Sequence, residues 1–329
     1  MIGDGGWGTT LALLLAKKGY QLRLWSPFAE YAALLQEKRE NVKFLPGIRI
    51  PKEIVISSDM AQVLEGTEVV TLAVPSHFMR SVAERMKGVS FSDRVVVSVS
   101  KGIENETLFR MSEVIQDVLG RMKLAILSGP TIAPEVARGL PAMAVVASPD
   151  DKVARQIQDI FSTDTFGLYT SDDLIGVELG GALKNVIAIA AGISDGLGLG
   201  TNTKAALFTR GLVEMARLGV KIGARMETFS GLSGMGDLVT TCLSPESRNR
   251  SFGEKIGRGG KMEEILKGSE QVVEGVRTAL SAVALGKRHN KEMPIIYQVK
   301  EVLYDGKDPR QAVKELMERR RGEELKIGV

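Results

Sequence analysis

The pattern of apolar residues changes character about halfway along the chain. Up to about Ser171, short runs rich in Val, Ile and Leu alternate with amphipathic segments, and beyond it the strand-like runs stop. Near-continuous apolar runs are typical of parallel strands buried on both faces, and their alternation with helices predicts right-handed βαβ units. We therefore predict an α/β fold, with a doubly wound sheet over residues 1–170 and an all-α domain over 171–329.

The predicted elements follow from these runs and their flanking residues. Strands are predicted over 21–25, 53–57, 68–74, 94–100, 123–127 and 142–147. Helices are predicted between them over 9–18, 59–64, 76–87, 107–119 and 150–161, with Ser76 and Thr107 as N-caps. Further helices are predicted over 172–194, 204–222, 226–232, 250–258, 262–267, 276–286, 294–304 and 309–320.

Composition narrows the class of protein. A length of 329 residues suits two domains, and a net charge of +3 argues against a nucleic-acid-binding face spread over the molecule. Cys242 is the single cysteine, so no intramolecular disulfide can form, and we expect no metal site. We find no secretory signal pattern and no uncharged run near the ~18 residues of a membrane span. We expect a soluble cytoplasmic protein without integral membrane contact.

The first motif stands at the start of the chain. Gly3, Gly5 and Gly8 form G-x-G-x-x-G, and an apolar helical segment follows at once. In dinucleotide-binding proteins, the first glycine permits a tight turn, the second lets the pyrophosphate approach, and the third lets helix and strand pack closely. Free N–H groups at the helix N-terminus then face the phosphates. The alternative is a simple strand–helix turn; the alternating strands and helices favour a Rossmann-like domain.

The strand expected before this motif is short. Only Met1 and Ile2 precede Gly3, whereas a strand normally has about five or six residues. We therefore expect the native chain to begin several residues upstream, and expect a longer first strand to raise thermal stability.

The second motif is a lysine within an apolar helix. Small and apolar residues surround Lys184 and Asn185 on nearly every side of the segment from Glu178 to Gly192. Such a helix is buried, and a buried lysine needs a partner or a role. The alternative is a lysine that snorkels at the helix edge. Burial moves the pKa of a lysine from about 10.4 towards 7–8, so we favour an acid/base role for Lys184.

A third motif is a basic loop at a helix start. Ser247, Arg248, Asn249 and Arg250 offer the side chains that bind phosphate, but a solvated basic turn fits the same residues equally well. Asp237 is the nearest carboxylate that could orient a cation, although an Asp at this place is also a common N-cap.

Taken in order, these blocks resemble a known family. They are 3–9 (GDGGWGT), 73–77 (AVPSH), 100–104 (SKGIE), 127–131 (LSGPT), 178–192, 234–238 (GMGDL) and 247–250 (SRNR). The chain resembles the bacterial-type NAD(P)-dependent glycerol-3-phosphate dehydrogenases over essentially its whole length. The resemblance implies a cytoplasmic homodimer that interconverts dihydroxyacetone phosphate and sn-glycerol 3-phosphate and supplies glycerophospholipid synthesis.

The resemblance also implies roles for residues. It implies that Lys184 is the proton donor and acceptor. Substrate-binding positions are Lys101, Gly129, Thr131, Lys184, Asp237, Ser247, Arg248 and Asn249. Cofactor-binding positions are Gly3, Gly5, Gly6, Trp7, Gly8, Lys101, Ala133, Arg248, Val272 and Glu274. Two residues depart from the family's pattern: Asp4 stands where alanine is usual, and Gly6 where serine is common.

The cofactor is expected to be NAD or NADP, with NADH used at least as well as NADPH. A dinucleotide fold discriminates at the end of its second strand, where an acid bonds the ribose 2′-OH and an arginine accommodates a 2′-phosphate. Here Ser26, Pro27 and Phe28 follow that strand and supply no cation. Two alternatives remain: a dehydrogenase of the same plan acting on a hydroxy acid or sugar nucleotide, and a non-catalytic dinucleotide sensor.

Overall fold

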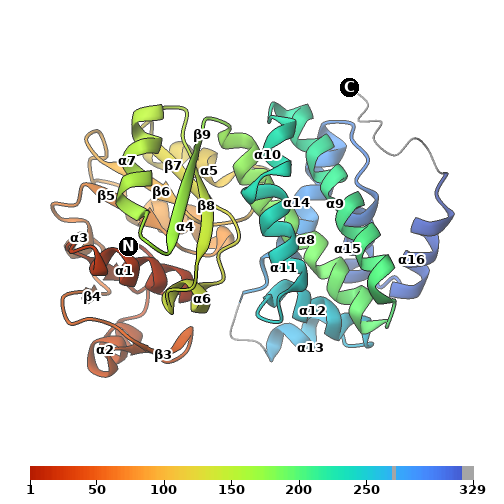
Figure 1. The fold of residues 1–329 in the computed structure, drawn as a ribbon, viewed down its shortest axis with the longest axis horizontal. Helices are drawn as coiled ribbons and strands as arrows, with labels where there is room; N and C mark the ends of the chain where they lie inside the picture. Colours follow the sequence, from red (N-terminus) through yellow and green to blue (C-terminus); the bar gives the residue numbers. More distant parts are fainter. Residues whose placement is uncertain (269–271, 321–329) are drawn as a thin grey trace. The chain divides into compact units, whose positions relative to one another are not determined.

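The computed structural model describes residues 1–268 and 272–320, which form two compact units (Figure 1). One unit comprises Met1–Ser100 and Met111–Leu174; the other comprises Lys101–Arg110 and the described residues beyond Leu174. Each unit has its own apolar core. The first is α/β, and beyond Ser171 the described residues form helices only, which confirms the predicted fold class.

One sheet organises the α/β unit. Its strands are β1 (Arg23–Trp25), β4 (Val55–Ser57), β5 (Val69–Leu72), β6 (Val95–Ser98), β7 (Lys123–Ser128), β8 (Ala142–Ala147) and β9 (Phe166–Ser171). Ile2 bridges Trp25 and Leu72 in parallel, and so joins the β1–β4 pair to the five strands from β5 to β9. With Ile2 counted as the first strand, the first six strands have the spatial order 3-2-1-4-5-6 of a Rossmann sheet.

Helices and a hairpin accompany this sheet. They are α1 (Gly6–Lys17), α2 (Ala29–Lys38), the hairpin β2 (Glu40–Asn41) and β3 (Leu45–Arg49), α3 (Met60–Leu64), the 3₁₀ turn η1 (Ser76–Phe78), α4 (Met79–Arg85), α5 (Met111–Leu119), α6 (Ala133–Ala137) and α7 (Asp151–Phe161). Helix α7 shows the expected periodicity, because Val153, Ile157 and Phe161 recur every four residues and are buried.

The structure differs from the expected parallel sheet at one strand. Strand β8 runs antiparallel to β7, whereas β9 is again parallel to β8. The β7–β8 connection contains only α6, whose five residues span about 7.5 Å. A strand of six residues is about 20 Å long, so this helix cannot return the chain to the start of β7 for a parallel crossover.

Both predicted N-caps are wrong. Ser76 is the first residue of η1, and Pro75 precedes it as the cap. Helix α5 begins at Met111, and the hydroxyl of Thr107 accepts a hydrogen bond from the backbone N–H of Phe109 instead. Residues 101–110 belong to the helical unit, and α5 begins directly after them.

The second unit is a cluster of helices. They are α8 (Leu174–Gly196), α9 (Gly200–Ile222), α10 (Met226–Ser230), the π-helical turn η2 (Leu232–Gly236), α11 (Asp237–Leu243), α12 (Arg248–Gly257), α13 (Met262–Lys267), α14 (Glu274–Arg288), α15 (Pro294–Tyr304) and α16 (Pro309–Glu318). Cys242 is fully buried in this core. Helix α8 is long and apolar enough to cross a membrane, but 89% of its most apolar window is buried inside the protein, as in the core helix of a soluble protein.

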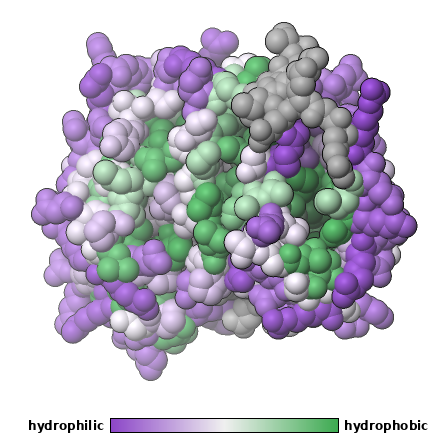
Figure 2. Space-filling view, turned by 45° about the vertical axis from the view of Figure 1, so that its right-hand side comes forward, coloured by the Kyte–Doolittle hydropathy of each residue, from purple (hydrophilic) through white to green (hydrophobic). Residues whose placement is uncertain are grey.

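The surface is more polar than the apolar cores. Figure 2 shows one face of the molecule, where hydrophilic side chains predominate and apolar side chains form separate patches. The core of each unit therefore holds most of the long apolar runs that the sequence shows.

Residues 101–110 are joined to the helical unit although both flanking segments belong to the α/β unit. Ile103 pairs with Arg110 across a small antiparallel turn and packs in the helical core. The guanidinium of Arg110 lies 2.5 Å from Oε2 of Glu178 on α8, and both side chains are largely buried. This segment therefore brings Lys101 to the helical unit.

Candidate active site

Helix α8 carries Lys184 through the core of the helical unit. The residues from Gly176 to Ser194 are all buried, and Lys184 and Asn185 are only 6% and 4% exposed. Glycines let neighbouring segments approach the helix closely: a Cβ on Gly180 would lie 2.6 Å from the backbone oxygen of Ser233. The lysine therefore cannot reach solvent by snorkelling along the helix edge.

Two lysines converge on one carboxylate. The Nζ atom of Lys184 lies 2.8 Å from Oδ1 of Asp237, and the Nζ atom of Lys101 lies 2.5 Å from Oδ2. Asp237 is the first residue of α11 and Gly236 is its N-cap, so the alternative interpretation of Asp237 as an N-cap is wrong. Two cations against one anion leave this cluster with a net charge of +1 when all three groups are ionised.

Burial and pairing set the protonation of these groups. Burial lowers the pKa of Lys184 to about 8, although the negative charge of Asp237 acts in the opposite direction. Burial acts to raise the pKa of Asp237, but Lys101 and Lys184 outweigh it and hold the pKa below its ordinary value. Lys184 is therefore charged at neutral pH but can release its proton close to it.

Thr241 is a site residue that the sequence did not indicate. Its Oγ1 atom accepts a hydrogen bond of 2.5 Å from Nζ of Lys184 and lies 3.3 Å from Oδ1 of Asp237. An ammonium has three N–H donors, and Asp237 and Thr241 accept two of them. The third N–H has no acceptor among the described residues. The i, i+4 spacing of Asp237 and Thr241 on α11 was the only available signal.

A chain of amides links Asn185, the neighbour of Lys184 in the sequence, to the basic loop. Nδ2 of Asn249 donates to Oδ1 of Asn185 over 2.9 Å, and Oδ1 of Asn249 accepts from the backbone N–H of Gly275, also over 2.9 Å. The starts of α12 and α14 are thereby fixed to the middle of α8. Glu274 is the first residue of α14, and the half-buried Val272 lies just before it.

The two arginines of the basic loop have different surroundings. Ser247 caps α12 by accepting a hydrogen bond from the backbone N–H of Arg250. Arg250 is tied to Asp195, since its Nε lies 2.8 Å from Oδ2 of that carboxylate. Arg248 is the first residue of α12 and is exposed as a residue, but burial of its guanidinium lowers its pKa, with the negative charge of Glu274 acting in the opposite direction. Because Arg250 already pairs with Asp195, Arg248 is the arginine of the pair that is better placed to bind an anion.

The glycine turn in the α/β unit has the backbone geometry of a dinucleotide loop. Gly3 has φ +113°, and a Cβ on Gly8 would lie 2.1 Å from the backbone oxygen of Gly3. Gly5 precedes α1, no side chain caps this helix, and a Cβ on Gly5 would meet nothing within 4 Å. The turn therefore leaves open space beside the second glycine, as close approach of a pyrophosphate requires.

Other predicted residues of the α/β unit cluster around this turn or follow β7. A hydroxyl bond from Thr10 to the backbone oxygen of Ala133 joins α1 to α6. Trp7 is half-buried and packs edge-on against Phe166. Gly129 follows β7 with φ +148°, and Thr131 donates to its carbonyl. The predicted site residues thus form two groups, one in each unit.

The unusual Asp4 points into the protein. Its side chain is 8% exposed, and burial raises the pKa of its carboxyl group, with a hydrogen bond from Ser26 acting against this shift. Burial thus disfavours the ionised form of Asp4.

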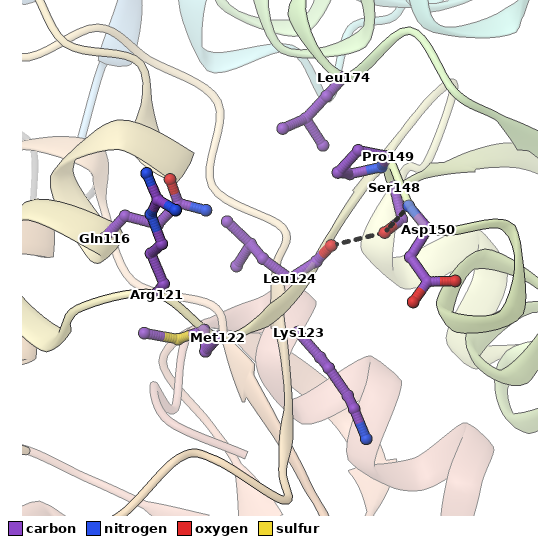
Figure 3. A pocket seen from close by; sticks show the side chains of 9 residues that line it. All are labelled: Gln116, Arg121, Met122, Lys123, Leu124, Ser148, Pro149, Asp150 and Leu174. Carbon is purple, nitrogen blue, oxygen red and sulfur yellow. Dashed lines mark hydrogen bonds between the residues drawn. The ribbon is translucent and has the colours of Figure 1, made fainter.

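A separate cavity of about 320 Å³ lies at the other end of the strands (Figure 3). Residues at the start of β7 and just after β8 line it, whereas the glycine turn and Gly129 follow the carboxyl ends of parallel strands. The hydroxyl of Ser148 in this cavity already bonds the backbone oxygen of Leu124 over 2.8 Å. None of the predicted site residues lines this cavity.

Comparisons with known proteins point to one family. The family model of the NAD-dependent glycerol-3-phosphate dehydrogenase N-terminus matches residues 1–154, and that of the C-terminus matches 173–314. The chain is 50% identical to a glycerol-3-phosphate dehydrogenase (NAD(P)+) of Syntrophotalea carbinolica over 97% of each chain. It is 48% identical to that of Moorella thermoacetica over 100% of this chain and 98% of the relative.

A solved structure is similar throughout. The crystal structure of glycerol-3-phosphate dehydrogenase from Coxiella burnetii superposes with a TM-score of 0.94 at 40% identity. The match covers 97% of this chain and 98% of that one.

Proposed function

Because this chain belongs to the NAD-dependent glycerol-3-phosphate dehydrogenase family, it is an NAD(P)-dependent oxidoreductase that reduces dihydroxyacetone phosphate to sn-glycerol 3-phosphate, and we propose that Lys184 is its proton donor. One observation carries this assignment. A buried ammonium with a pKa lowered to about 8 is held by Asp237 and Thr241, with one N–H left for a ligand.

The reaction needs a proton where negative charge develops. The reduced nicotinamide, when bound, supplies the hydride that adds to the ketone carbon. The ketone oxygen then gains negative charge, which a cation in a buried site stabilises better than water does. Lys184 gives its proton from Nζ to this oxygen, and the alcohol forms. In the reverse direction the neutral amine takes the proton back.

Lys101 and Asp237 prepare Lys184 for this step. Asp237 fixes the position of the Lys184 ammonium, and Lys101 adds a second positive charge on the other carboxylate oxygen. All three residues belong to the helical unit, so these contacts around the donor lie within that unit. Such preorganisation removes the cost of reorienting charges during the reaction.

The phosphate of the substrate is assigned to the start of α12. Arg248 offers a guanidinium at the first position of this helix, where backbone N–H groups also favour an anion. Asn249 is fixed through Asn185 beside Lys184. We assign Ser247, Gly129 and Thr131 to the same substrate. Remote binding of the phosphate then orients the reacting carbon.

The dinucleotide is assigned to the glycine turn. The open space beside Gly5 and the uncapped start of α1 fit a pyrophosphate. The proposed binding residues are Gly3, Gly5, Gly6, Trp7, Gly8, Lys101, Ala133, Arg248, Val272 and Glu274. Residues 1–170 would then bind mainly the cofactor and residues 171–329 mainly the substrate. Gly129 and Thr131 are nevertheless assigned to the substrate, Val272 and Glu274 to the cofactor, and Lys101 and Arg248 to both.

The setting of the enzyme is also proposed. We propose a cytoplasmic homodimer whose product supplies glycerophospholipid synthesis.

One assay tests the activity: NADH is oxidised when dihydroxyacetone phosphate is added to the purified protein. Oxidation with a hydroxy-acid precursor but not with dihydroxyacetone phosphate, or binding of NADH without turnover, would point to the two alternatives. Sedimentation of the same sample tests the dimer.

A further inference from the structure

One buried asparagine has every hydrogen-bonding position of its side chain occupied. Asn41 on β2 is 0% exposed. Its Nδ2 atom donates to the backbone oxygen of Asp4 and to Oγ1 of Thr9, each over 2.7 Å. Its Oδ1 atom accepts from the hydroxyl of Tyr31 over 2.7 Å and from the backbone N–H of Phe44 over 3.1 Å. A side-chain amide has two donors and two acceptor lone pairs, and all four are used.

The partners lie on two sides of Asn41. Asp4 and Thr9 belong to the glycine turn and to α1, whereas Tyr31 and Phe44 belong to α2 and to the β2–β3 hairpin. The amide therefore joins the hairpin to the turn. Burying it is favourable only with all these bonds in place, because an unpaired buried donor or acceptor costs about 1–3 kcal/mol.

The bond to Asp4 fixes the orientation of a peptide unit in the turn. The carbonyl of Asp4 accepts from Asn41 and also from Oγ1 of Thr9, which lies 3.3 Å away. In a trans peptide, the carbonyl oxygen and the following N–H point in opposite directions. With its carbonyl held towards Asn41, the Asp4–Gly5 peptide directs the N–H of Gly5 away from the hairpin.

The hairpin also rests directly on the start of α1. A Cβ on Gly6 would lie 2.6 Å from the backbone oxygen of Phe44, closer than real Cβ atoms approach. The backbone of the hairpin and the backbone of the helix N-terminus are therefore in contact, and Gly6 permits it. The departure at Gly6 from the serine common in the family thus has a structural reason in this chain.

We propose that Asn41 is a positioning residue for the dinucleotide: by tying the β2–β3 hairpin to the glycine turn, it holds the N–H donors of that turn in the orientation that a pyrophosphate requires. The proposal rests on the cofactor site assigned above. Asn41 itself contacts neither cofactor nor substrate. Its loss would weaken cofactor binding without changing the proton donor, since Lys184 and Asp237 belong to the other unit.

Three variants separate this role from general destabilisation. Asn41→Asp keeps the shape but replaces the amide nitrogen, which donates both bonds to the turn, by a carboxylate oxygen. This oxygen cannot donate to the Asp4 carbonyl. Thr9→Val keeps Asn41 and removes one of its acceptors together with the second donor to Asp4. Tyr31→Phe is the matched control, because it removes one bond on the hairpin side and leaves both bonds to the turn.

The measurements are the Kd for NADH by fluorescence titration, steady-state kinetics with dihydroxyacetone phosphate, and the thermal midpoint. We expect Asn41→Asp to raise the Kd and KM for NADH at least tenfold, Thr9→Val to raise them severalfold, and Tyr31→Phe to leave them within twofold. At saturating NADH, kcat and the KM for dihydroxyacetone phosphate should stay within twofold of the parent in all three.

Equal NADH affinity in folded Asn41→Asp or Thr9→Val would overturn the proposal. A matching loss of kcat at saturating NADH would also overturn it, because that pattern describes a general structural defect. If Asn41→Asp does not fold, Thr9→Val decides by the same criteria. A parent protein that binds NADH but does not oxidise it with dihydroxyacetone phosphate would refute the proposed function instead, and the NADH affinities would still test Asn41.

Discussion

Lys184 and Asp237 form a buried ion pair of 2.8 Å within the helical unit, and Lys101 occupies the second oxygen of the same carboxylate. The carboxylate is thus shared between two ammonium groups. The negative charge of Asp237 partly offsets the effect of burial, which lowers the pKa of Lys184 to about 8. The lysine is therefore protonated at neutral pH and can lose its proton slightly above it.

Replacing Lys184 by alanine is expected to abolish most turnover. General acid catalysis contributes about 10²–10⁴-fold to the rate, so kcat should decrease by a factor in that range. The Kd for NADH should stay near the parent value. The exposed Lys221 at the end of α9 offers a control, and Lys221→Ala should leave kcat unchanged. Near-normal kcat in Lys184→Ala would refute the proton-donor assignment.

The pH dependence should have opposite signs in the two directions. Reduction of the ketone needs the protonated amine, and the pKa of Lys184 is lowered to about 8. The rate of reduction at saturating substrates should therefore fall as pH rises through about 8, whereas oxidation of sn-glycerol 3-phosphate should rise. Stopped-flow measurement of the hydride step at several pH values checks this. A rate of reduction that is flat or rises over this range would contradict it.

Asp237→Asn should shift that profile to lower pH. The negative charge of Asp237 raises the pKa of Lys184, so its removal lets burial lower this pKa further. Breaking a buried ion pair costs about 3–5 kcal/mol, which urea unfolding would show. Asp305 pairs with Lys300 at the surface, and Asp305→Asn should destabilise the protein far less than Asp237→Asn does. An unshifted profile in Asp237→Asn would rule out the proposed coupling.

The two arginines of the basic loop should behave differently. Arg248→Ala should raise the KM for dihydroxyacetone phosphate about tenfold or more and lower kcat, because a charge-assisted anchor is lost. Arg250 is tied to Asp195, so Arg250→Ala should mainly lower the unfolding midpoint. Kinetics and thermal melts of both variants provide the comparison. Unchanged kinetics in Arg248→Ala would place the phosphate elsewhere.

We expect the enzyme to use NADH at least as efficiently as NADPH. Ser26, Pro27 and Phe28 after β1 provide no cation for a 2′-phosphate, and Ser26 is fully buried. The measurement is kcat/KM for NADH and NADPH at one salt concentration. A tenfold preference for NADPH, equivalent to about 1.4 kcal/mol, would show this prediction to be wrong.

The sequence predicted best the elements whose two ends are marked by turn residues. Helix α13 and strand β8 have the expected bounds, because glycines flank the helix and prolines stand near both ends of the strand. Strand β9, helix α2 and the β2–β3 hairpin were missed. In β9, only Phe166 and Leu168 are buried, so its pattern is too short to distinguish from a loop.

Only the site residues that stand out in the local sequence pattern were predicted from the residues themselves. Lys184 was recognisable because a charge within a long apolar run is unusual, and Asp237 because it stands beside a glycine cluster. Their contact could not be read from the sequence, since 53 residues separate them. Thr241 and Asn41 are ordinary polar residues by composition, and only their hydrogen bonds in the folded chain distinguish them.

The attachment of residues 101–110 to the helical unit has a consequence for how the chain can be divided. The backbone passes between the units after Ser100, after Arg110 and after Leu174, so no single cut separates them. A gene fragment encoding only the residues from Ile175 onward would lack Lys101, and its Asp237 would retain Lys184 as its only lysine partner. Recombination at residue 174 would take the two lysines that share Asp237 from different parents.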